Sequence, residues 1–197
     1  MTDIRKKLRA ARKSLTSAYK KEASISIASE ENFNLFLQEH QNVRRIGIYL
    51  ALQEEININA LIEKLWKKNI HTYCPLLHPV KPSHLFFIEY SSSSFLVKDR
   101  YGITTPKFDP NKILAPWELD AVLTPLVGFD ENGNRIGMGA GFYDSSFAYR
   151  TIFKDETPMI GCAYDCQKLE HINVNIWDQP LDGILTESGY IKTNLRR

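Results

Sequence analysis

The sequence has few cysteines and no long apolar run, and each shortage excludes a class of protein. The cysteines are Cys74, Cys162 and Cys166, an odd number without a C-x-x-C pair. This argues against a disulfide framework and against a structural zinc site. The longest apolar runs, such as IGIYLAL, are far too short to span a bilayer. The N-terminus lacks the apolar stretch of a secretory signal, so we expect a cytoplasmic protein without a membrane partner.

An excess of charge of one sign is also missing. The net charge is +2 over 197 residues, which by itself does not indicate a nucleic-acid partner. The basic residues are unevenly placed, however, because residues 5–13 (RKKLRAARK) contain six of them and no acidic residue. A run of this kind is usually the solvated face of a helix, so we expect no nucleic-acid partner.

Length and patterning favour one α/β domain. Hydrophobic residues make up 43% of the chain, which is ordinary for a globular protein with a proper core. Apolar residues at helical spacing predict helices that begin after Asp3 and that cover about 18–38 and 57–70. Short apolar runs predict strands over 45–52, 71–77, 84–90, 119–129, 158–164 and 181–187. The strand–helix–strand order over 45–77 is a βαβ unit, which predicts a parallel sheet.

The stretch NRIGMGAGFYDSS (134–146) places glycines at every second position. Gly137, Gly139 and Gly141 follow a predicted strand and precede a predicted helix, an order that suits phosphate binding because an anion can then reach bare backbone N–H groups. Arg135 would add a planar cation, and Asp144 could hold the Mg²⁺ that accompanies a nucleoside triphosphate. A glycine-rich turn with a surface arginine and a helix-capping aspartate explains the same residues. The stretch matches neither the Walker loop nor the dinucleotide fingerprint, so both interpretations stay open.

The longer block LTPLVGFDENGNRIGMGAGFYD (123–144) resembles the hallmark P-x-x-x-F-D-x-x-G-x-R-L-G-x-G-x-G-Y-Y-D of the 5-formyltetrahydrofolate cyclo-ligase, or methenyltetrahydrofolate synthetase, family. The residues in register are Pro125, Phe129, Asp130, Gly133, Arg135, Gly137, Gly139, Gly141, Tyr143 and Asp144. Three further segments resemble family motifs, namely RKKLR (5–9), YLALQEEIN (49–57) and WDQPLDGILTE (177–187). Departures such as Phe142 in place of a tyrosine leave the glycines and Asp144 in place.

The resemblance implies a fold and a reaction. The fold would be a single domain over residues 1–197, with three αβα layers and a mostly parallel sheet, similar to the sugar-phosphate isomerase and CoA-transferase folds. The reaction would convert 5-formyltetrahydrofolate and MgATP into 5,10-methenyltetrahydrofolate, ADP and phosphate, carried out by a monomer. Transfer of the γ-phosphoryl group to the formyl oxygen would activate the poorly electrophilic formyl carbon for attack by N10. Phosphoryl transfer depends on positioning and charge neutralisation, so no covalent protein nucleophile is expected.

The resemblance also assigns residues to ATP and Mg²⁺. The implied ATP site comprises Arg5, Arg9, Arg135, Gly137, Met138, Gly139, Ala140, Gly141, Phe142 and Tyr143. Asp144 and Asp178 would bind Mg²⁺. The other basic residues of the N-terminal run would be solvated, namely Lys6, Lys7, Arg12 and Lys13.

For the folate, the resemblance points to Leu50, Glu55 and Tyr143. Glu55 follows the end of a predicted strand, where open α/β sheets place ligands. Its carboxylate can accept two N–H groups of a pterin. Tyr143 and Tyr101 could flank the pterin by stacking, although Tyr101 fits a core or loop position equally well.

Two other functions remain alternatives. Sugar-phosphate isomerases and CoA transferases have a similar architecture, and fold alone does not settle function. Two aspartates, an arginine and a glycine loop favour MgATP over the ligands of those enzymes. A non-catalytic protein that binds RNA through its basic helix is disfavoured by the small net charge and the lack of a recognisable nucleic-acid module.

Overall fold

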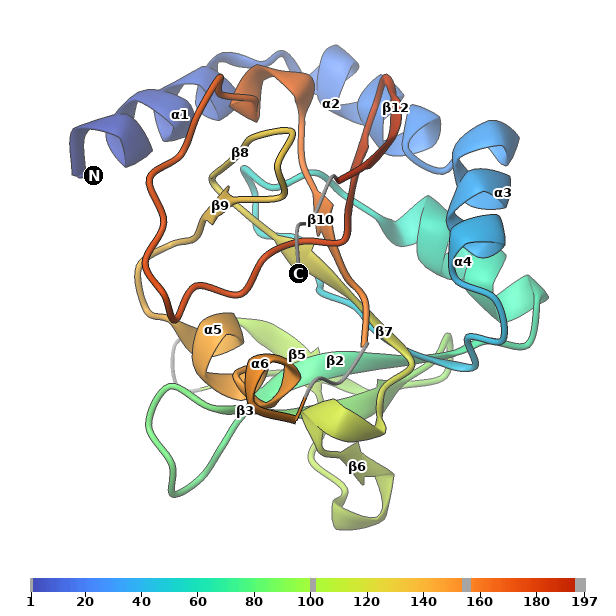
Figure 1. The fold of residues 1–197 in the computed structure, drawn as a ribbon. Helices are drawn as coiled ribbons and strands as arrows, with labels where there is room; N and C mark the ends of the chain where they lie inside the picture. The colour runs from blue at the N-terminus through green and yellow to red at the C-terminus, as the bar shows by residue number, and fades with distance from the viewer. Residues whose placement is uncertain (1, 100–101, 154–156, 194–197) are drawn as a thin grey trace.

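The structure is a computed structural model that describes residues 2–99, 102–153 and 157–193. Within these residues an eight-stranded mixed sheet forms the centre of the fold (Figure 1). Its spatial order is β12 (Gly189–Lys192), β11 (Gly183–Thr186), β10 (Met159–Cys162), β7 (Ala121–Pro125), β1 (Arg45–Gly47), β2 (His71–Leu77), β3 (Leu85–Tyr90) and β6 (Ile113–Leu114). Two separate strand pairs are β4 (Leu96–Lys98) with β5 (Thr104–Pro106) and β8 (Gly128–Phe129) with β9 (Arg135–Ile136). The helices are α1 (Thr2–Ser14), α2 (Ser17–Ser26), α3 (Glu30–Glu39), α4 (Asn59–Lys67), α5 (Phe142–Ser146) and α6 (Tyr149–Phe153).

The central strands β11, β10, β7, β1 and β2 run parallel. Ile46 of β1 lies opposite Thr72 of β2 and Ala121 of β7. The unit β1–α4–β2 is the βαβ crossover expected over 45–77, and that expectation is confirmed. Antiparallel β3 and β6 extend one edge of the sheet, and antiparallel β12 extends the other.

Helices cover both faces of this sheet. On one face α2, α3 and α4 share a core with the strands, in which Phe36 and Ile46 are fully buried. On the other face Phe147, directly after α5, is buried together with Val122 of β7. Figure 1 shows α3 and α4 on the opposite side of the sheet from α5 and α6. The expected α/β fold of helix, sheet and helix layers is therefore confirmed.

Helix α1 lies against the β8–β9 hairpin. Leu8 clusters with Val127, which directly precedes β8, and with Ile136 of β9. A Cβ on Gly128 would lie 2.6 Å from Leu8 Cδ1, so a larger residue there would displace the Leu8 side chain. The packing holds the N-terminal helix beside the segment that follows β9.

The helix predicted over 18–38 is wrong in one respect, because the chain forms two helices there. Helix α2 ends at Ser26, and Ser29 begins the second helix, since its Oγ accepts a hydrogen bond from Asn32 N at 3.2 Å. Thr16 caps α2 in the same way through Tyr19 N at 3.1 Å. Both are side-chain N-caps, which start a helix by satisfying one of its free N–H groups.

The strand predicted over 119–129 is also divided. The carbonyl of Leu126 accepts hydrogen bonds from Arg12 and Gln167 side chains, and Val127 accepts from Gln167 as well. These side chains replace the sheet partners of this backbone, so β7 ends and β8 begins a separate hairpin.

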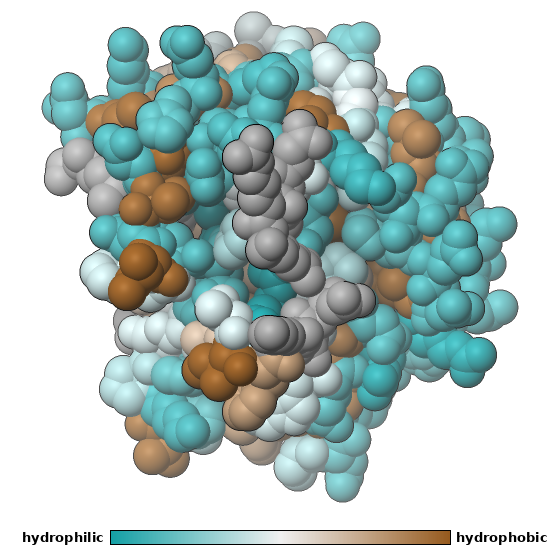
Figure 2. Space-filling view, viewed as in Figure 1, coloured by the Kyte–Doolittle hydropathy of each residue, from teal (hydrophilic) through white to brown (hydrophobic). Residues whose placement is uncertain are grey.

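The visible surface carries mixed polarity. Figure 2 shows a mainly hydrophilic face, with apolar side chains in small separate groups. Among the described residues, no helix combines the length and the apolar character needed to cross a membrane.

Candidate active site

The glycine segment forms a loop between β9 and α5. Gly139 and Gly141 have φ angles of 105° and 68°, in the left-handed region that favours glycine. A Cβ on Gly137 would meet no atom within 4 Å, so the space beside it is open. Within the described parts of the chain, no group accepts a hydrogen bond from the N–H groups of residues 138–141. The loop therefore offers free donors next to open space.

A pocket of about 480 Å³ lies over this loop, and we call it the glycine-loop pocket. Its wall consists of Arg5, the segment 135–145, Pro125 and residues between 172 and 178. Every residue of the implied ATP site except Arg9 lines it, as do Asp144 and Asp178. Arg9 is exposed on α1 and is not part of the wall.

Helix α1 brings Arg5 to the loop. The Nε of Arg5 donates a hydrogen bond to the Gly137 carbonyl at 2.9 Å. Its Cζ lies 4.0 Å from the position that a Cβ on Gly139 would occupy. A fixed cation therefore stands at the edge of the pocket, where an anionic ligand would be stabilised.

Arg135 and Asp144 form an ion pair in the same pocket. Arg135 Nη2 lies 2.7 Å from Asp144 Oδ1, and their side chains are 5% and 29% exposed. The same carboxylate oxygen accepts a hydrogen bond from Gln179 N at 3.0 Å, while Arg135 also donates to the Gln179 carbonyl. The alternative of a surface arginine in a plain turn is therefore wrong. The side chain of Arg135 is buried, and it joins Asp144 to the segment that contains Asp178.

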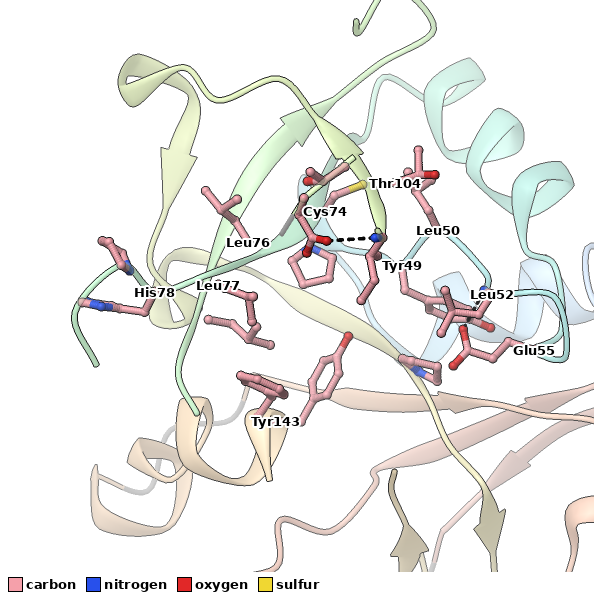
Figure 3. A pocket seen from close by; sticks show the side chains of 18 residues that line it. Tyr49, Leu50, Leu52, Glu55, Cys74, Leu76, Leu77, His78, Thr104 and Tyr143 are labelled. Atoms are coloured by element: carbon pink, nitrogen blue, oxygen red, sulfur yellow. Dashed lines mark hydrogen bonds between the residues drawn. The ribbon is translucent and has the colours of Figure 1, made fainter. Parts of the chain in front are cut away.

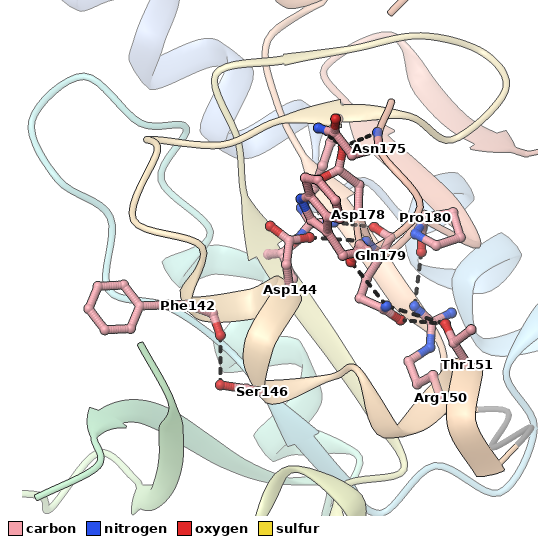
Figure 4. A network of polar contacts seen from close by, with 12 residues as sticks. Phe142, Asp144, Ser146, Arg150, Thr151, Asn175, Asp178, Gln179 and Pro180 are labelled. Atoms are coloured by element: carbon pink, nitrogen blue, oxygen red, sulfur yellow. Dashed lines mark hydrogen bonds and ion pairs between the residues drawn. The ribbon is translucent and has the colours of Figure 1, made fainter. Parts of the chain in front are cut away.

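Asp178 lies across the pocket from α5, close to Asp144 in Figure 4. Its Oδ2 accepts hydrogen bonds from Asn175 N at 2.8 Å and Asn175 Nδ2 at 3.3 Å. Asp144 Oδ2 and Asp178 Oδ1 therefore take part in none of these hydrogen bonds. Within the described ranges, no group of three or more His, Cys, Asp or Glu side chains is arranged to hold a metal. Two carboxylates fit Mg²⁺, which takes one or two of them and completes its shell with water and phosphate.

A second cavity of about 450 Å³ lies beside the ends of β1 and β2, and we call it the strand-end cavity (Figure 3). All three residues of the implied folate site line it, namely Leu50, Glu55 and Tyr143. Most of the remaining wall is apolar, including Leu76, Leu77 and Leu85. An apolar cavity with few polar groups is typical of a site for a flat organic ligand.

Glu55 is the acidic side chain nearest the end of β1 in this wall. Its Oε2 accepts a hydrogen bond from Leu52 N at 2.9 Å. Burial raises the pKa of Glu55, and the Leu52 N–H and the charge of Arg12 oppose that rise. Two further hydrogen bonds hold the surrounding loop, from Tyr49 Oη to the Ile56 carbonyl at 2.9 Å and from Tyr164 Oη to the Glu55 carbonyl at 3.4 Å.

Arg12 corrects the expectation of a solvated side chain. It is only 2% exposed. Its Nη1 donates to the Leu126 carbonyl at 3.1 Å, and its Nη2 lies 3.9 Å from Glu54 Oε2. The basic run on α1 therefore serves both sites, with Arg5 at the glycine loop and Arg12 beneath the loop that carries Glu55.

Three residues line both pockets, and we call Pro125, Phe142 and Tyr143 the shared wall. Figure 3 shows the Tyr143 side chain directed toward the residues of the strand-end cavity. Its hydroxyl is buried and has no hydrogen-bond partner among the described residues. Burial raises the pKa of Tyr143, so the hydroxyl stays protonated near neutral pH. Ligands in the two pockets would meet at this wall.

The sequence indicated only Leu50, Glu55 and Tyr143 as folate contacts in the strand-end cavity. Cys74 and His78 line it without belonging to any motif. No signal in the sequence marks them, because strand β2, which contains Cys74 and directly precedes His78, reaches the cavity only through the tertiary fold. Tyr101, the other stacking candidate, lies outside the described residues.

The fold and the two adjoining pockets are those of an α/β protein that can hold two small-molecule ligands next to each other. Parallel strands end beside the apolar cavity, and a glycine loop with paired carboxylates forms the neighbouring pocket. The family model for 5-formyltetrahydrofolate cyclo-ligases matches residues 1–187. The chain belongs to the 5-formyltetrahydrofolate cyclo-ligase family.

Similar proteins agree with this assignment. The chain is 37% identical over 182 residues to a 5-formyltetrahydrofolate cyclo-ligase of Haemophilus influenzae, covering 92% of this chain and 95% of the relative. It is 40% identical over 143 residues to the Escherichia coli K12 protein of that name, covering 73% and 78%. A 5,10-methenyltetrahydrofolate synthetase of Aquifex aeolicus shares the fold, with a TM-score of 0.76, 22% identity and coverage of 100% and 94%. A 5,10-methenyltetrahydrofolate synthetase of Mycoplasma pneumoniae has a TM-score of 0.68 and 25% identity, with coverage of 94% of this chain and 98% of that chain.

Proposed function

We propose that this chain closes 5-formyltetrahydrofolate to 5,10-methenyltetrahydrofolate at the expense of ATP, as its family membership indicates. The γ-phosphoryl group passes to the formyl oxygen, and ADP leaves. N10 then attacks the formyl carbon and loses its proton, and the C–O bond breaks as phosphate departs. This sequence needs two ligands held in contact and a neutralised phosphate charge, with no covalent protein nucleophile.

The observation that carries the proposal is the shared wall. Pro125, Phe142 and Tyr143 border both pockets, so a pterin on one side and a triphosphate on the other can bring their reacting atoms together. Glu55 would accept N–H groups of the pterin, with Leu50 and Tyr143 packed against the ring. A half-buried carboxylate in an apolar cavity supports this role.

For ATP we propose the glycine-loop pocket, with Arg5 beside the phosphates and backbone N–H groups of 137–143 donating to them. Arg135, Met138 and Ala140 complete the wall, and Arg9 stays a predicted contact from α1. Asp144 and Asp178 would hold Mg²⁺, which supplies positive charge to the phosphates. Arg135 would keep the Asp144 carboxylate oriented, since it pairs with one of its oxygens at 2.7 Å.

We further propose that residues 1–197 act as one cyclo-ligase domain, as a cytoplasmic monomer without a nucleic-acid partner. The small net charge of +2 supports the last point.

The decisive experiment measures methenyltetrahydrofolate by its near-ultraviolet absorbance. Purified protein is mixed with 5-formyltetrahydrofolate, Mg²⁺ and ATP, and parallel samples omit ATP or contain excess chelator. We expect product only in the complete mixture, with one ADP released for each product formed. Folded protein that makes no product in the complete mixture would refute the proposal.

A further inference from the structure

Thr105 is a buried threonine whose hydroxyl has no protein partner. It lies in the middle of β5 opposite Val97 of β4, and it is 7% exposed. The residue lines the strand-end cavity, and its Oγ1 is buried within the wall. Among the described residues, no group forms a hydrogen bond with its Oγ1. Buried polar atoms are nearly always paired, so this hydroxyl requires an explanation.

Thr72 shows how a buried threonine in this protein is normally satisfied. It is fully buried in β2, outside both pockets. Its Oγ1 accepts a hydrogen bond from Trp66 Nε1 at 2.8 Å and donates one to the Tyr90 carbonyl at 2.6 Å. The two threonines therefore differ in partners and in location. Only the unpaired one borders a cavity.

The cavity offers a reason for keeping the Thr105 hydroxyl. A hydroxyl without a partner lowers the stability of the free protein, because its desolvation is not compensated. A rotation of about 120° about the single torsion χ1 moves the hydroxyl to another staggered position, such as the one that the methyl group now occupies. A ligand with hydrogen-bonding atoms on its edge can then supply the missing partner.

We propose that the Thr105 hydroxyl hydrogen-bonds the folate in the strand-end cavity and is a specificity-determining residue of that site. The inference rests on the proposed function, because it takes the ligand to be a reduced folate. The pteridine edge presents both donors and acceptors, and a hydroxyl can pair with either. Thr105 would act with Glu55 and Tyr143, two further polar side chains that line the same cavity.

The test compares Thr105→Val, Thr105→Ser and Thr72→Val. For Thr105→Val we expect the KM for 5-formyltetrahydrofolate to rise about 2- to 10-fold, the equivalent of one neutral hydrogen bond, with the KM for ATP unchanged. Its melting temperature should equal or exceed that of the wild type, because the lost hydroxyl had no partner. Thr105→Ser keeps the hydroxyl and should restore the wild-type KM.

Thr72→Val is the matched control, since the same change removes a hydroxyl that is paired. It should lower the melting temperature by about 2–6 °C and leave both KM values unchanged. Calorimetric titration of each variant with 5-formyltetrahydrofolate, without ATP, gives a second readout that is independent of turnover.

The outcomes separate this inference from the proposed function. If the wild type makes product and Thr105→Val binds the folate as the wild type does, the role of Thr105 is refuted while the activity stands. A lower melting temperature for Thr105→Val with unchanged folate affinity would identify a structural hydroxyl instead. If the wild type neither binds nor converts the folate, the proposed function fails and the inference fails with it.

Discussion

The two pockets meet at one wall but are built in opposite ways. The wall of the glycine-loop pocket is mainly one continuous segment, 135–145. Its backbone offers free N–H groups next to open space. The strand-end cavity gathers side chains from β2, β5, α5 and the loop after β1, which are far apart in the sequence. The first pocket suits a ligand recognised by charge, and the second suits a ligand recognised by shape. Substitutions on the two sides should therefore affect the two substrates separately.

The largest effect is expected from Asp144→Asn, which removes a charge from the glycine-loop pocket. We expect kcat/KM to fall at least about 100-fold, as for losses close to a metal, and the Mg²⁺ concentration needed for half-maximal rate to rise. The fold should lose about 1–3 kcal/mol, since Arg135 is left with a weaker partner. Glu131→Gln removes the same charge from an exposed ion pair with Lys168 and serves as the control. An Asp144→Asn enzyme with normal Mg²⁺ dependence would show that the metal binds elsewhere.

Gly137→Ala tests whether the open space beside the loop belongs to ATP. No atom lies within 4 Å of the added Cβ, so the melting temperature should stay the same or rise slightly. The methyl group would occupy space that a phosphate needs, and we expect the KM for ATP to rise about 10- to 100-fold, the loss of a charge-assisted hydrogen bond. The KM for the folate should not change.

Gly139→Ala provides the comparison, because its φ of 105° makes any side chain strained. It should lower the melting temperature as well as ATP affinity, measured by thermal unfolding and initial rates. If Gly137→Ala leaves the KM for ATP untouched, the phosphates do not lie on this part of the loop.

The smallest of the three effects is expected for Glu55→Gln, on the cavity side. The KM for 5-formyltetrahydrofolate should rise about 10-fold at neutral pH, because a charge-assisted hydrogen bond is lost, while the KM for ATP stays constant. Burial raises the pKa of Glu55, so in the wild type the KM for folate should also rise as the pH falls through that raised value. The Gln variant should lack this pH dependence in the same rate measurements.

Glu55→Gln should weaken folate binding but stabilise the fold at neutral pH. A carboxyl group whose pKa is higher in the folded than in the unfolded protein stabilises the fold only at low pH, and this contribution is lost as the pH rises. Glu55→Gln should therefore be more stable than the wild type at neutral pH, and the gain should disappear in acid. Denaturant unfolding at the two pH values measures it. A variant that is less stable at neutral pH would show that the Glu55 charge supports the loop.

The contrast between the pockets also explains how far the sequence could be interpreted. The glycine loop was recognisable because its requirements, left-handed φ at Gly139 and Gly141, are local and leave glycines in the sequence. The unit β1–α4–β2 was predicted for the same reason, since its hydrophobic periodicity is local. Glu55 and Leu50 were reached through the family resemblance rather than through their own chemistry.

Features that depend on distant partners were missed or misjudged. Strand β6 has two residues, Ile113 and Leu114, and it exists because they pair with Ile88 and Phe87. Arg12 looked like a solvated residue of a basic run, but its acceptor, the Leu126 carbonyl, lies 114 residues away in the chain. Such positions are fixed by tertiary contacts, which override local patterning.

The shared wall has a consequence for inhibitor design. Pro125, Phe142 and Tyr143 border both pockets, so ligands in the two pockets would lie next to each other. One compound that joins a pteridine to a phosphate-like group by a short tether can occupy both sites. It then loses translational and rotational entropy once instead of twice. Linking the fragments makes the second binding step intramolecular, with an effective concentration set by tether length. The length and bend of the tether would have to match the position of this wall, so both would contribute to selectivity.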